Sequence, residues 1–185
     1  MSIFLEEFEF AKSQVSDINE HVETLYELAL ECDHVTEMGV RQGKSTRAFL
    51  HASPKKLISY DLVKEDSVTE LFTKAKENGA DYSYEEADTE NLTIEETDLL
   101  FIDTSHTYKQ LQIELDLHGS KSRKYIILHD TVTYGGTDEP GQRYSGQGEK
   151  SGLTPAIDEF IEENPHWEVF INKTNNNGLT VLKRT

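Results

Sequence analysis

Residues 97–106 read TDLLFIDTSH, and this stretch decides the fold. The run Leu99–Ile102 is continuously apolar, which is typical of a central parallel strand covered on both faces. It ends abruptly at Asp103. A second buried strand is predicted at 124–128 (KYIIL), and it ends in a histidine and an aspartate. Two such strands predict an α/β protein with polar side chains at one edge of its sheet.

The remaining strands and helices alternate along the chain. Further strands are predicted at 34–38, 57–61 and 82–87, and helices at 18–29, 45–51, 66–78, 108–117 and 154–163. We expect Ser16 or Asp17 to cap the first helix, with Glu20 closing a capping box with Asp17. Residues 167–171 and 179–182 flank an Asn-Gly turn, which predicts an antiparallel hairpin. Five β-then-α units followed by a hairpin predict a doubly wound, Rossmann-like α/β sheet that is mostly parallel, with an antiparallel C-terminal hairpin strand.

The composition excludes several classes of protein. The chain has 185 residues, the size of one domain, and its 35 acidic and 18 basic residues give a net charge of −17. This charge argues against a nucleic-acid-binding surface and against binding to anionic membranes. The single cysteine, Cys32, excludes an internal disulfide and a cysteine-rich zinc site, and we expect it to be a small core residue. The start of the sequence shows no secretion signal, so we expect a cytoplasmic protein.

The loop after the first predicted strand, EMGVRQGKS at 37–45, allows three interpretations. Its GKST tail suggests a phosphate-binding P-loop, but that loop needs four residues between its glycines, and three separate Gly39 from Gly43. A dinucleotide fingerprint needs G-x-G-x-x-G, which is absent. The third interpretation is an E-x-G-x-x-x-G loop for the methionine end of S-adenosylmethionine, with Asp61 for the ribose. We favour it because it accounts for Glu37, both glycines and Asp61 together.

Four segments of the chain carry a resemblance to a known family. They are VTEMGVRQGKST at 35–46, ISYDL at 58–62, LLFIDTSHTYKQLQIELDL at 99–117 and YIILHDT at 125–131. In this order and spacing they resemble class I S-adenosylmethionine-dependent methyltransferases, in particular the small subfamily related to cephalosporin hydroxylase and macrocin O-methyltransferase proteins. The resemblance covers about residues 16–183 and implies the seven-stranded methyltransferase fold. It also implies a helical lead-in at 1–33 and a single S-adenosylmethionine-binding domain at 34–185, with a glycine-rich lid loop at 133–152.

The resemblance implies which residues bind the cofactor S-adenosylmethionine. Glu37 and the two glycines would line its methionine end, Asp61 would bind the ribose, and Asp88 would flank the adenine. The implied cofactor-binding residues are Glu37, Gly39, Val40, Gly43, Ser45, Asp61, Leu62 and Asp88. The residues alone leave a simpler alternative for two of them, since Asp61 could cap the helix that follows and Glu37 could cap its own loop.

The metal-dependent members of the family bind Mg²⁺ through acids that follow the fourth and fifth strands. The implied metal ligands here are Asp103, His129 and Asp130, and the implied catalytic residues are Asp103 and His106, with His106 as the general base. Two positions depart from the family pattern, since Thr104 stands where glycine is usual and His129 stands where an acid is usual. Because Mg²⁺ prefers oxygen ligands, His129 admits another divalent metal. Alternatively, Asp103 and Asp130 cap the helices that follow them.

The activity implied by the resemblance is S-adenosylmethionine-dependent O-methylation of a small-molecule or sugar hydroxyl, assisted by a divalent metal and a histidine base. The lid loop holds six of the eleven glycines and would close over the acceptor. We expect a small-molecule acceptor and no nucleic-acid or membrane partner. A second copy of the chain could complete the site, which would make the protein a homo-oligomer.

Two alternatives for the function stay open. One is a P-loop-like nucleotide-binding phosphohydrolase or kinase, because the apolar run before Asp103 imitates a Walker B strand. The other is a non-catalytic accessory protein that binds the cofactor.

Acidic side chains are predicted to gather at the edge of the sheet where the parallel strands end. The five concerned are Glu37, Asp61, Asp88, Asp103 and Asp130. Carboxylates gathered in this way raise one another's pKa values unless cations or hydrogen-bond donors satisfy them. The pattern therefore indicates a preference for a cationic ligand over one that is rich in phosphate.

Overall fold

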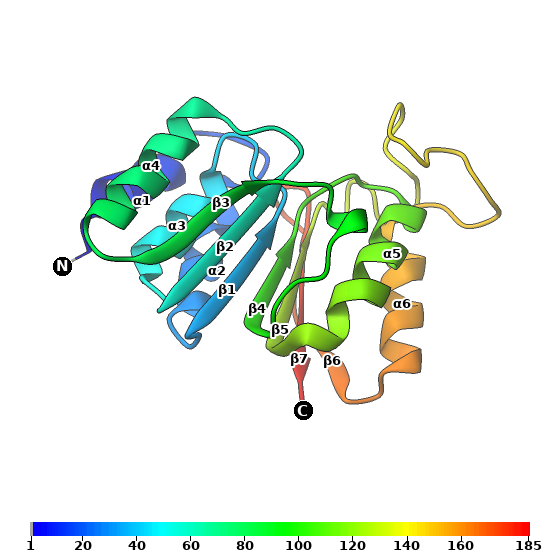
Figure 1. The fold of residues 1–185 in the computed structure, drawn as a ribbon. Helices are drawn as coiled ribbons and strands as arrows, with labels where there is room; N and C mark the ends of the chain where they lie inside the picture. The colour runs from blue at the N-terminus through cyan, green and yellow to red at the C-terminus, as the bar shows by residue number, and fades with distance from the viewer. Residues whose placement is uncertain (1) are drawn as a thin grey trace.

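The sheet at the centre of the protein has seven strands in the order β3-β2-β1-β4-β5-β7-β6. The computed structural model describes residues 2–185 (Figure 1). The strands are β1 (His34–Met38), β2 (Lys56–Asp61), β3 (Asp81–Glu86), β4 (Thr97–Ile102), β5 (Ser122–His129), β6 (Trp167–Lys173) and β7 (Leu179–Arg184). Strands β1 to β5 are parallel, and β7 pairs antiparallel with both β5 and β6. This is the doubly wound, seven-stranded methyltransferase fold, as predicted from the sequence.

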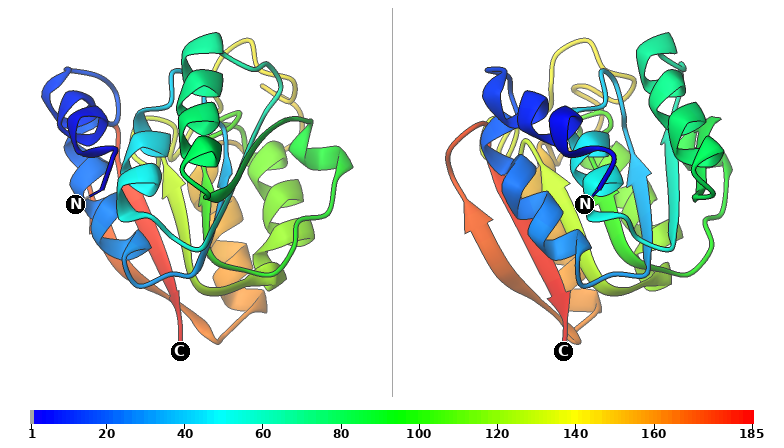
Figure 2. Two further views of the ribbon diagram at one scale, coloured as in Figure 1. Left: turned by 60° about the vertical axis from the view of Figure 1, so that its left-hand side comes forward. Right: turned by 90° about the vertical axis from the view of Figure 1, so that its left-hand side faces the viewer.

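Helices cover both faces of the sheet (Figure 2). One face carries α1 (Leu5–Ser13), α2 (Val22–Ala29), α3 (Lys44–Ala52) and α4 (Asp66–Glu77), and the other carries α5 (Tyr108–His118) and α6 (Leu153–Glu163). Short 3-10 turns lie at Asn19–His21 (η1), Thr89–Asn91 (η2) and Gly119–Lys121 (η3). In β4, Leu99 and Phe101 pack in the core of the first face, and Leu100 and Ile102 pack in that of the second. Strand β4 is therefore buried on both faces, as its apolar run predicts.

Two elements differ from the sequence prediction. Helix α1 lies within the helical lead-in that the resemblance implies at 1–33, but periodicity does not predict it as a separate helix, because it buries Phe8 and Ala11 in an otherwise polar segment and so carries a weak amphipathic pattern. The third predicted β-then-α unit has no α-helix, since η2 and an extended loop join β3 to β4. That connection, ADTENLTIEE at 87–96, is rich in residues that favour turns and has no helical period.

The N-terminal segment enters η1 through two reciprocal hydrogen bonds between Ser16 and Asn19. Ser16 Oγ accepts the N–H of Asn19 at 3.1 Å, and Asn19 Oδ1 accepts the N–H of Ser16 at 2.9 Å. The predicted capping box between Asp17 and Glu20 is therefore wrong. Asp17 instead accepts a hydrogen bond from Arg41 at 2.7 Å, and Glu20 binds the turn between β6 and β7.

Cys32 is buried in the core, as expected from the sequence. Burial raises the pKa of its thiol to about 12, so it is protonated and unreactive at neutral pH. Within residues 2–185, each helix is too short or too polar to pass through a bilayer.

Candidate functional site

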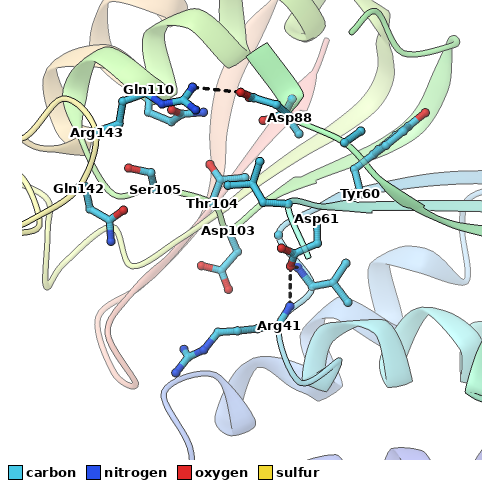
Figure 3. Close-up of a pocket in the computed structure, with 15 residues that line it drawn as sticks. Arg41, Tyr60, Asp61, Asp88, Asp103, Thr104, Ser105, Gln110, Gln142 and Arg143 are labelled. Carbon is cyan, nitrogen blue, oxygen red and sulfur yellow. Dashed lines mark hydrogen bonds and ion pairs between the residues drawn. The ribbon is translucent and has the colours of Figure 1, made fainter. Parts of the chain in front are cut away.

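A cavity of about 280 Å³ opens at the carboxyl ends of the parallel strands (Figure 3). Parallel α/β sheets bind ligands at this edge. Five of the eight predicted cofactor-binding residues line this cavity, namely Gly39, Val40, Asp61, Leu62 and Asp88. Ser45 lines a second cavity, whereas Glu37 and Gly43 are buried and line neither.

The loop between β1 and α3 passes very close to the end of β4. Gly39 has a φ of +83°, and a Cβ built on it would lie 1.9 Å from the carbonyl oxygen of Asp103. Gly43, which precedes α3, has a φ of +69°, and its Cβ would lie 2.8 Å from Val68. A side chain would be strained at both positions, and it would be crowded by backbone atoms of Asp103 at Gly39 and by the Val68 side chain at Gly43.

The carboxylate of Asp61, at the end of β2, binds the same loop (Figure 3). Its Oδ2 accepts the N–H groups of Val40 and Arg41, both at 2.8 Å, and its Oδ1 accepts that of Val63 at 3.3 Å. Asp61 does not cap α4, because that helix begins after Glu65. The loop N–H groups that a P-loop would direct at a phosphate are here bound to a carboxylate.

Glu37 is wholly buried beneath this loop. Ser45 donates a hydrogen bond to Oε1 at 2.6 Å, Thr46 donates to Oε2 at 2.9 Å, and Ser59 also donates to Oε2. Burial raises the pKa of Glu37 to about 7, although the three hydroxyl donors act against the rise. Glu37 thus joins β1, β2 and α3 beneath the loop, and the cavities do not expose it.

The substitution Glu37→Gln is expected to flatten the pH dependence of stability. A folded-state pKa of about 7, above the reference value of 4.5, means that the folded protein binds this proton more tightly than the unfolded chain. The resulting stability is complete below the reference pKa and is lost as the pH rises to about 7, by roughly 3 kcal/mol in all. Urea unfolding between about pH 4.5 and 7.5 measures the loss. The exposed variant Glu27→Gln should keep the wild-type slope, and the same slope in Glu37→Gln would contradict the prediction.

Loop 133–152 borders the cavity of about 280 Å³ through Gln142 and Arg143. The loop contains no helix or strand, as predicted. Arg143 Nη1 lies 3.1 Å from a carboxylate oxygen of Asp88 and 3.1 Å from one of Glu90, and Tyr144 donates to Glu90 at 2.7 Å. Burial acts to raise the pKa of Asp88, but the N–H of Glu90 and the guanidinium of Arg143 hold it below its usual value. Arg143 also lines the cavity, so this part of the loop closes the region predicted for the adenine.

A second cavity, of about 250 Å³, adjoins the first. The two cavities share three lining residues, Val40, Arg41 and Asp103. The second cavity is also lined by Ser16, Asp17, Lys44 and Ser45. The Lys44 ammonium lies 4.9 Å from the ring centre of Phe10 in α1. The N-terminal segment therefore forms a wall of this cavity, and Asp103 stands where the two cavities meet.

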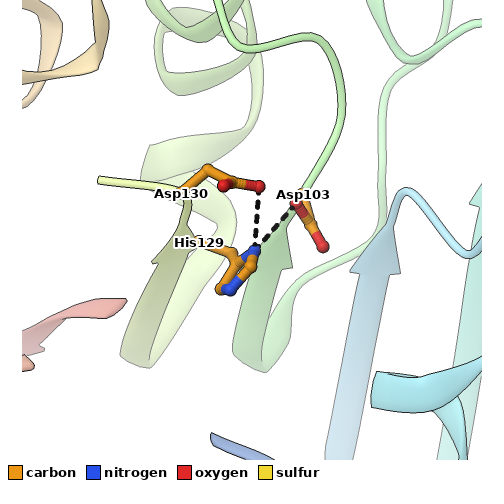
Figure 4. A group of neighbouring side chains, drawn as sticks. All are labelled: Asp103, His129 and Asp130. Carbon is orange, nitrogen blue, oxygen red and sulfur yellow. Dashed lines mark hydrogen bonds and ion pairs between the residues drawn. The ribbon is translucent and has the colours of Figure 1, made fainter. Parts of the chain in front are cut away.

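Asp103, His129 and Asp130, the three predicted metal ligands, lie together at the ends of β4 and β5 (Figure 4). His129 Nδ1 lies 3.3 Å from Asp103 Oδ1 and 3.1 Å from Asp130 Oδ2. Burial acts to lower the pKa of His129, but the two carboxylates raise it to about 10. Neither acid caps a helix, because Thr107 caps α5 and α6 follows Gly152.

His106 lies against the same two carboxylates. Its Nε2 is 3.1 Å from Asp103 Oδ1 and 3.1 Å from Asp130 Oδ2, and its Nδ1 is 2.8 Å from Glu139 Oε2. The ring of Tyr134 stacks on the imidazole, with 5.0 Å between the ring centres. Burial acts to lower the pKa of His106, but its carboxylate neighbours raise it above its usual value. Both ring nitrogens therefore face carboxylates.

The donor atoms at the ends of β4 and β5 fit a divalent cation. Asp130 Oδ1 is buried and has no hydrogen-bond partner among residues 2–185. Asp130 also has a φ of +58°, a strained conformation for a residue other than glycine. An unsatisfied buried oxygen is destabilising, and a cation bound by this carboxylate would satisfy it.

Three residues around the site are not identified from the sequence. Glu114 is wholly buried and accepts a hydrogen bond from Thr104 at 2.7 Å, and its position three residues after Leu111 on one helical face is a signal that could have found it. Glu139 and Asn176 lie in loops with no periodicity. No sequence signal places them beside the two histidines.

The fold is shared with solved methyltransferases that are distant in sequence. An O-methyltransferase from Bacillus cereus, in complex with SAH, is 15% identical with a TM-score of 0.64, and the match covers 98% of this chain and 90% of that chain. The N-methyltransferase NodS from Bradyrhizobium japonicum, in complex with S-adenosylhomocysteine (SAH), is 13% identical with a TM-score of 0.61, covering 98% of each chain. The 1,6-didemethyltoxoflavin-N1-methyltransferase of Burkholderia thailandensis is 15% identical with a TM-score of 0.59, covering 98% and 85%.

No protein-family model matches the chain, and no curated protein matches it in sequence. Of these three solved structures, one is an O-methyltransferase and two are N-methyltransferases. Likeness at this level of identity establishes the fold and leaves the acceptor open.

Proposed function

We propose that this protein is an S-adenosylmethionine-dependent methyltransferase that acts on a hydroxyl of a small molecule or sugar. The observation that carries the proposal is the pairing of two adjoining cavities with the loop between β1 and α3. The loop has the E-x-G-x-x-x-G sequence, Asp61 binds it from the next strand, and Asp103 lies where the cavities meet. A two-part ligand with its reacting group near Asp103 suits this shape.

Residues of the larger cavity would hold the adenosyl part of the cofactor. Tyr60 and Leu62 offer apolar surface, and the Asp61 carboxylate lies at the cavity wall, where ribose hydroxyls could donate to it. When bound, S-adenosylmethionine supplies a methyl group activated by its sulfonium. The protein's part is to orient the acceptor, to exclude water and to bind the acceptor's proton.

Asp103, His129 and Asp130 would hold a divalent metal beside the cavities. A metal there would lower the pKa of an acceptor hydroxyl. The sequence predicts His106 as the base for that proton, and this role requires a ring nitrogen that is free to accept it. Both nitrogens of His106 face carboxylates in the described structure.

The P-loop alternative is less well supported by the same geometry. The N–H groups of Val40 and Arg41 are bound to Asp61, and carboxylates of Asp88 and Asp103 also border the larger cavity. Negative groups at these positions would repel a polyphosphate. The Lys44 ammonium rests on Phe10 of α1.

Calorimetric titration with SAH and with ATP tests the proposal. We expect SAH to bind with micromolar affinity and ATP to bind at least about a hundredfold more weakly. Asp61→Asn should weaken SAH binding about tenfold or more, because the amide has no charge to strengthen the hydrogen bonds from Val40 and Arg41 and places an NH₂ group, itself a donor, against an N–H of the loop. Glu86→Gln, at the exposed end of the adjacent strand β3, is the matched control and should bind SAH as the wild type does.

Absence of SAH binding to the wild type would reject the proposal. ATP binding that is lost in Lys44→Ala would support the P-loop alternative. Transfer of a labelled methyl group to a panel of sugars and small hydroxyl compounds separates an enzyme from a non-catalytic accessory protein. SAH binding without transfer to any of them would favour the accessory protein.

Arg143→Ala is expected to speed the release of SAH about tenfold, because the guanidinium closes the larger cavity by binding Asp88 and Glu90. The unfolding free energy should stay close to that of the wild type, since the Arg143 side chain is half exposed. Arg123→Ala is the matched control. Arg123 has nearly the same exposed fraction (49% against 50%), and it binds Asp98 at the amino ends of the strands, away from the cavities. Stopped-flow release rates that are equal in the two variants would contradict a closing role for Arg143.

A further inference from the structure

Four donor atoms at the ends of β4 and β5 form a ring in which nitrogen and oxygen alternate. His106 Nε2 lies 3.1 Å from Asp103 Oδ1 and 3.1 Å from Asp130 Oδ2. His129 Nδ1 lies 3.3 Å and 3.1 Å from the same two oxygens. The four atoms belong to side chains at or just after the ends of two neighbouring strands.

Hydrogen bonds alone do not explain this arrangement. Each nitrogen carries at most one hydrogen, and that hydrogen can point well at one acceptor only. Both nitrogens nevertheless stand at nearly equal distances from two carboxylate oxygens. A cation shared by the two ring nitrogens and the two carboxylate oxygens would account for all four contacts.

The spacing of the four atoms agrees with a shared ion. Ligands about 2.1 Å from a metal lie about 3.0 Å apart when they subtend a right angle and about 3.4 Å apart in a tetrahedron. The four nitrogen–oxygen distances, 3.1 to 3.3 Å, fall within this interval. Asp130 Oδ1, the other oxygen of the same carboxylate, is buried without a hydrogen-bond partner among residues 2–185.

The outer nitrogen of each histidine is held by a further group. Glu139 accepts from His106 Nδ1 at 2.8 Å, and its own N–H donates to the carbonyl oxygen of His106 at 2.9 Å. The carbonyl oxygen of Asn176 lies 3.3 Å from His129 Nε2. Metal-binding histidines are usually oriented in this way, by a carboxylate or a backbone carbonyl on the second nitrogen.

We infer that His106 is a metal ligand, and that His106, Asp103, His129 and Asp130 form a four-residue centre for a first-row transition metal such as Zn²⁺, Mn²⁺ or Fe²⁺. Two imidazoles and two carboxylates suit these ions, whereas Mg²⁺ takes oxygen ligands almost exclusively. Glu139 is the positioning residue for His106. The inference rests on the metal site of the proposed function, and it replaces the predicted role of His106 as the base.

Titration of the metal-free protein with Co²⁺ tests this inference through the visible absorption of the bound ion. We expect one Co²⁺ per chain. His106→Gln should weaken Co²⁺ binding at least about a hundredfold and alter the spectrum, and Glu139→Gln should weaken it about tenfold or more. His166→Gln is the matched control, because His166 precedes β6 at the opposite edge of the sheet, and it should match the wild type. A wild type that binds no Co²⁺, or a His106→Gln variant with unchanged affinity and spectrum, would overturn the inference.

X-ray absorption of the loaded wild type covers the case in which His106→Gln does not fold. We expect scattering from two imidazoles, and a single imidazole would overturn the inference. Calorimetry with SAH in the presence of a chelator keeps the two proposals apart. If SAH fails to bind while Co²⁺ has two imidazole ligands, the methyltransferase proposal fails and the metal centre stands.

Discussion

Replacing Gly39 by alanine is expected to lower the free energy of unfolding by about 2 to 5 kcal/mol and to weaken SAH binding at least about tenfold. The new Cβ would lie 1.9 Å from the carbonyl oxygen of Asp103 and 2.5 Å from its carbonyl carbon. Both are backbone atoms at the end of a central strand, so they cannot move aside as a flexible side chain could. The loop between β1 and α3 must move instead, and it forms part of both cavities.

A second glycine separates the two causes of this effect. Gly79 has the same φ, +83°, but a Cβ there would meet no atom within 4 Å. Gly79→Ala should therefore show only the cost of the left-handed backbone, about 1 kcal/mol, with unchanged SAH affinity. Chemical denaturation and calorimetry of both variants give the comparison. Equal losses of stability in the two would mean that contact with β4 contributes nothing, contrary to the structure.

Asp103→Asn is expected to weaken Co²⁺ binding at least about a hundredfold and to slow methyl transfer about a thousandfold. The reason is that Asp103 faces His106 and His129 and also stands where the two cavities meet. An asparagine keeps the shape but has no charge to offer a cation. SAH affinity should change less than about threefold, because no cofactor atom depends on this charge in the proposal.

Asp98→Asn is the matched control on the same strand. Asp98 is buried at the amino end of β4, where it accepts two backbone N–H groups and pairs with Arg123. Its substitution should lower stability by about 1 to 3 kcal/mol and leave Co²⁺ and SAH binding unchanged. If Asp103→Asn kept wild-type Co²⁺ affinity, Asp103 would not be a ligand.

Strand positions were predictable from the sequence because burial on both faces leaves an unambiguous apolar run, as at Leu99–Ile102. Placement of the acids followed from the topology, since parallel strands end at one edge. The connection from β3 to β4 could not be anticipated as a 3-10 turn, because η2 depends on local hydrogen bonds of Asp88 rather than on periodicity. Helix α1 escaped prediction for a related reason, since its stability comes from contacts with α2 and α3.

Within the site, the sequence indicated which residues meet but not how each is satisfied. The five gathered acids were expected to raise one another's pKa values. The pKa of Glu37 is indeed raised, but burial is the main cause. The pKa of Asp103 is instead held below its usual value by the two histidines, although Asp103 is also buried. Ser59, one of the partners that decide these outcomes, lies beside Glu37 on the neighbouring strand β2. This pairing is a property of strand register, which no single motif contains.

The turn between β6 and β7 contacts both the N-terminal segment and the end of β5. The side chain of Asn176 accepts the N–H of Glu20 and donates to the carbonyl oxygen of Ser16, while its backbone carbonyl lies beside His129. The first two contacts join residues that are 156 and 160 positions apart. This turn is among the last parts of the chain to be synthesised. Ser16, which lines the second cavity, is therefore fixed by a contact that only a nearly complete chain can make.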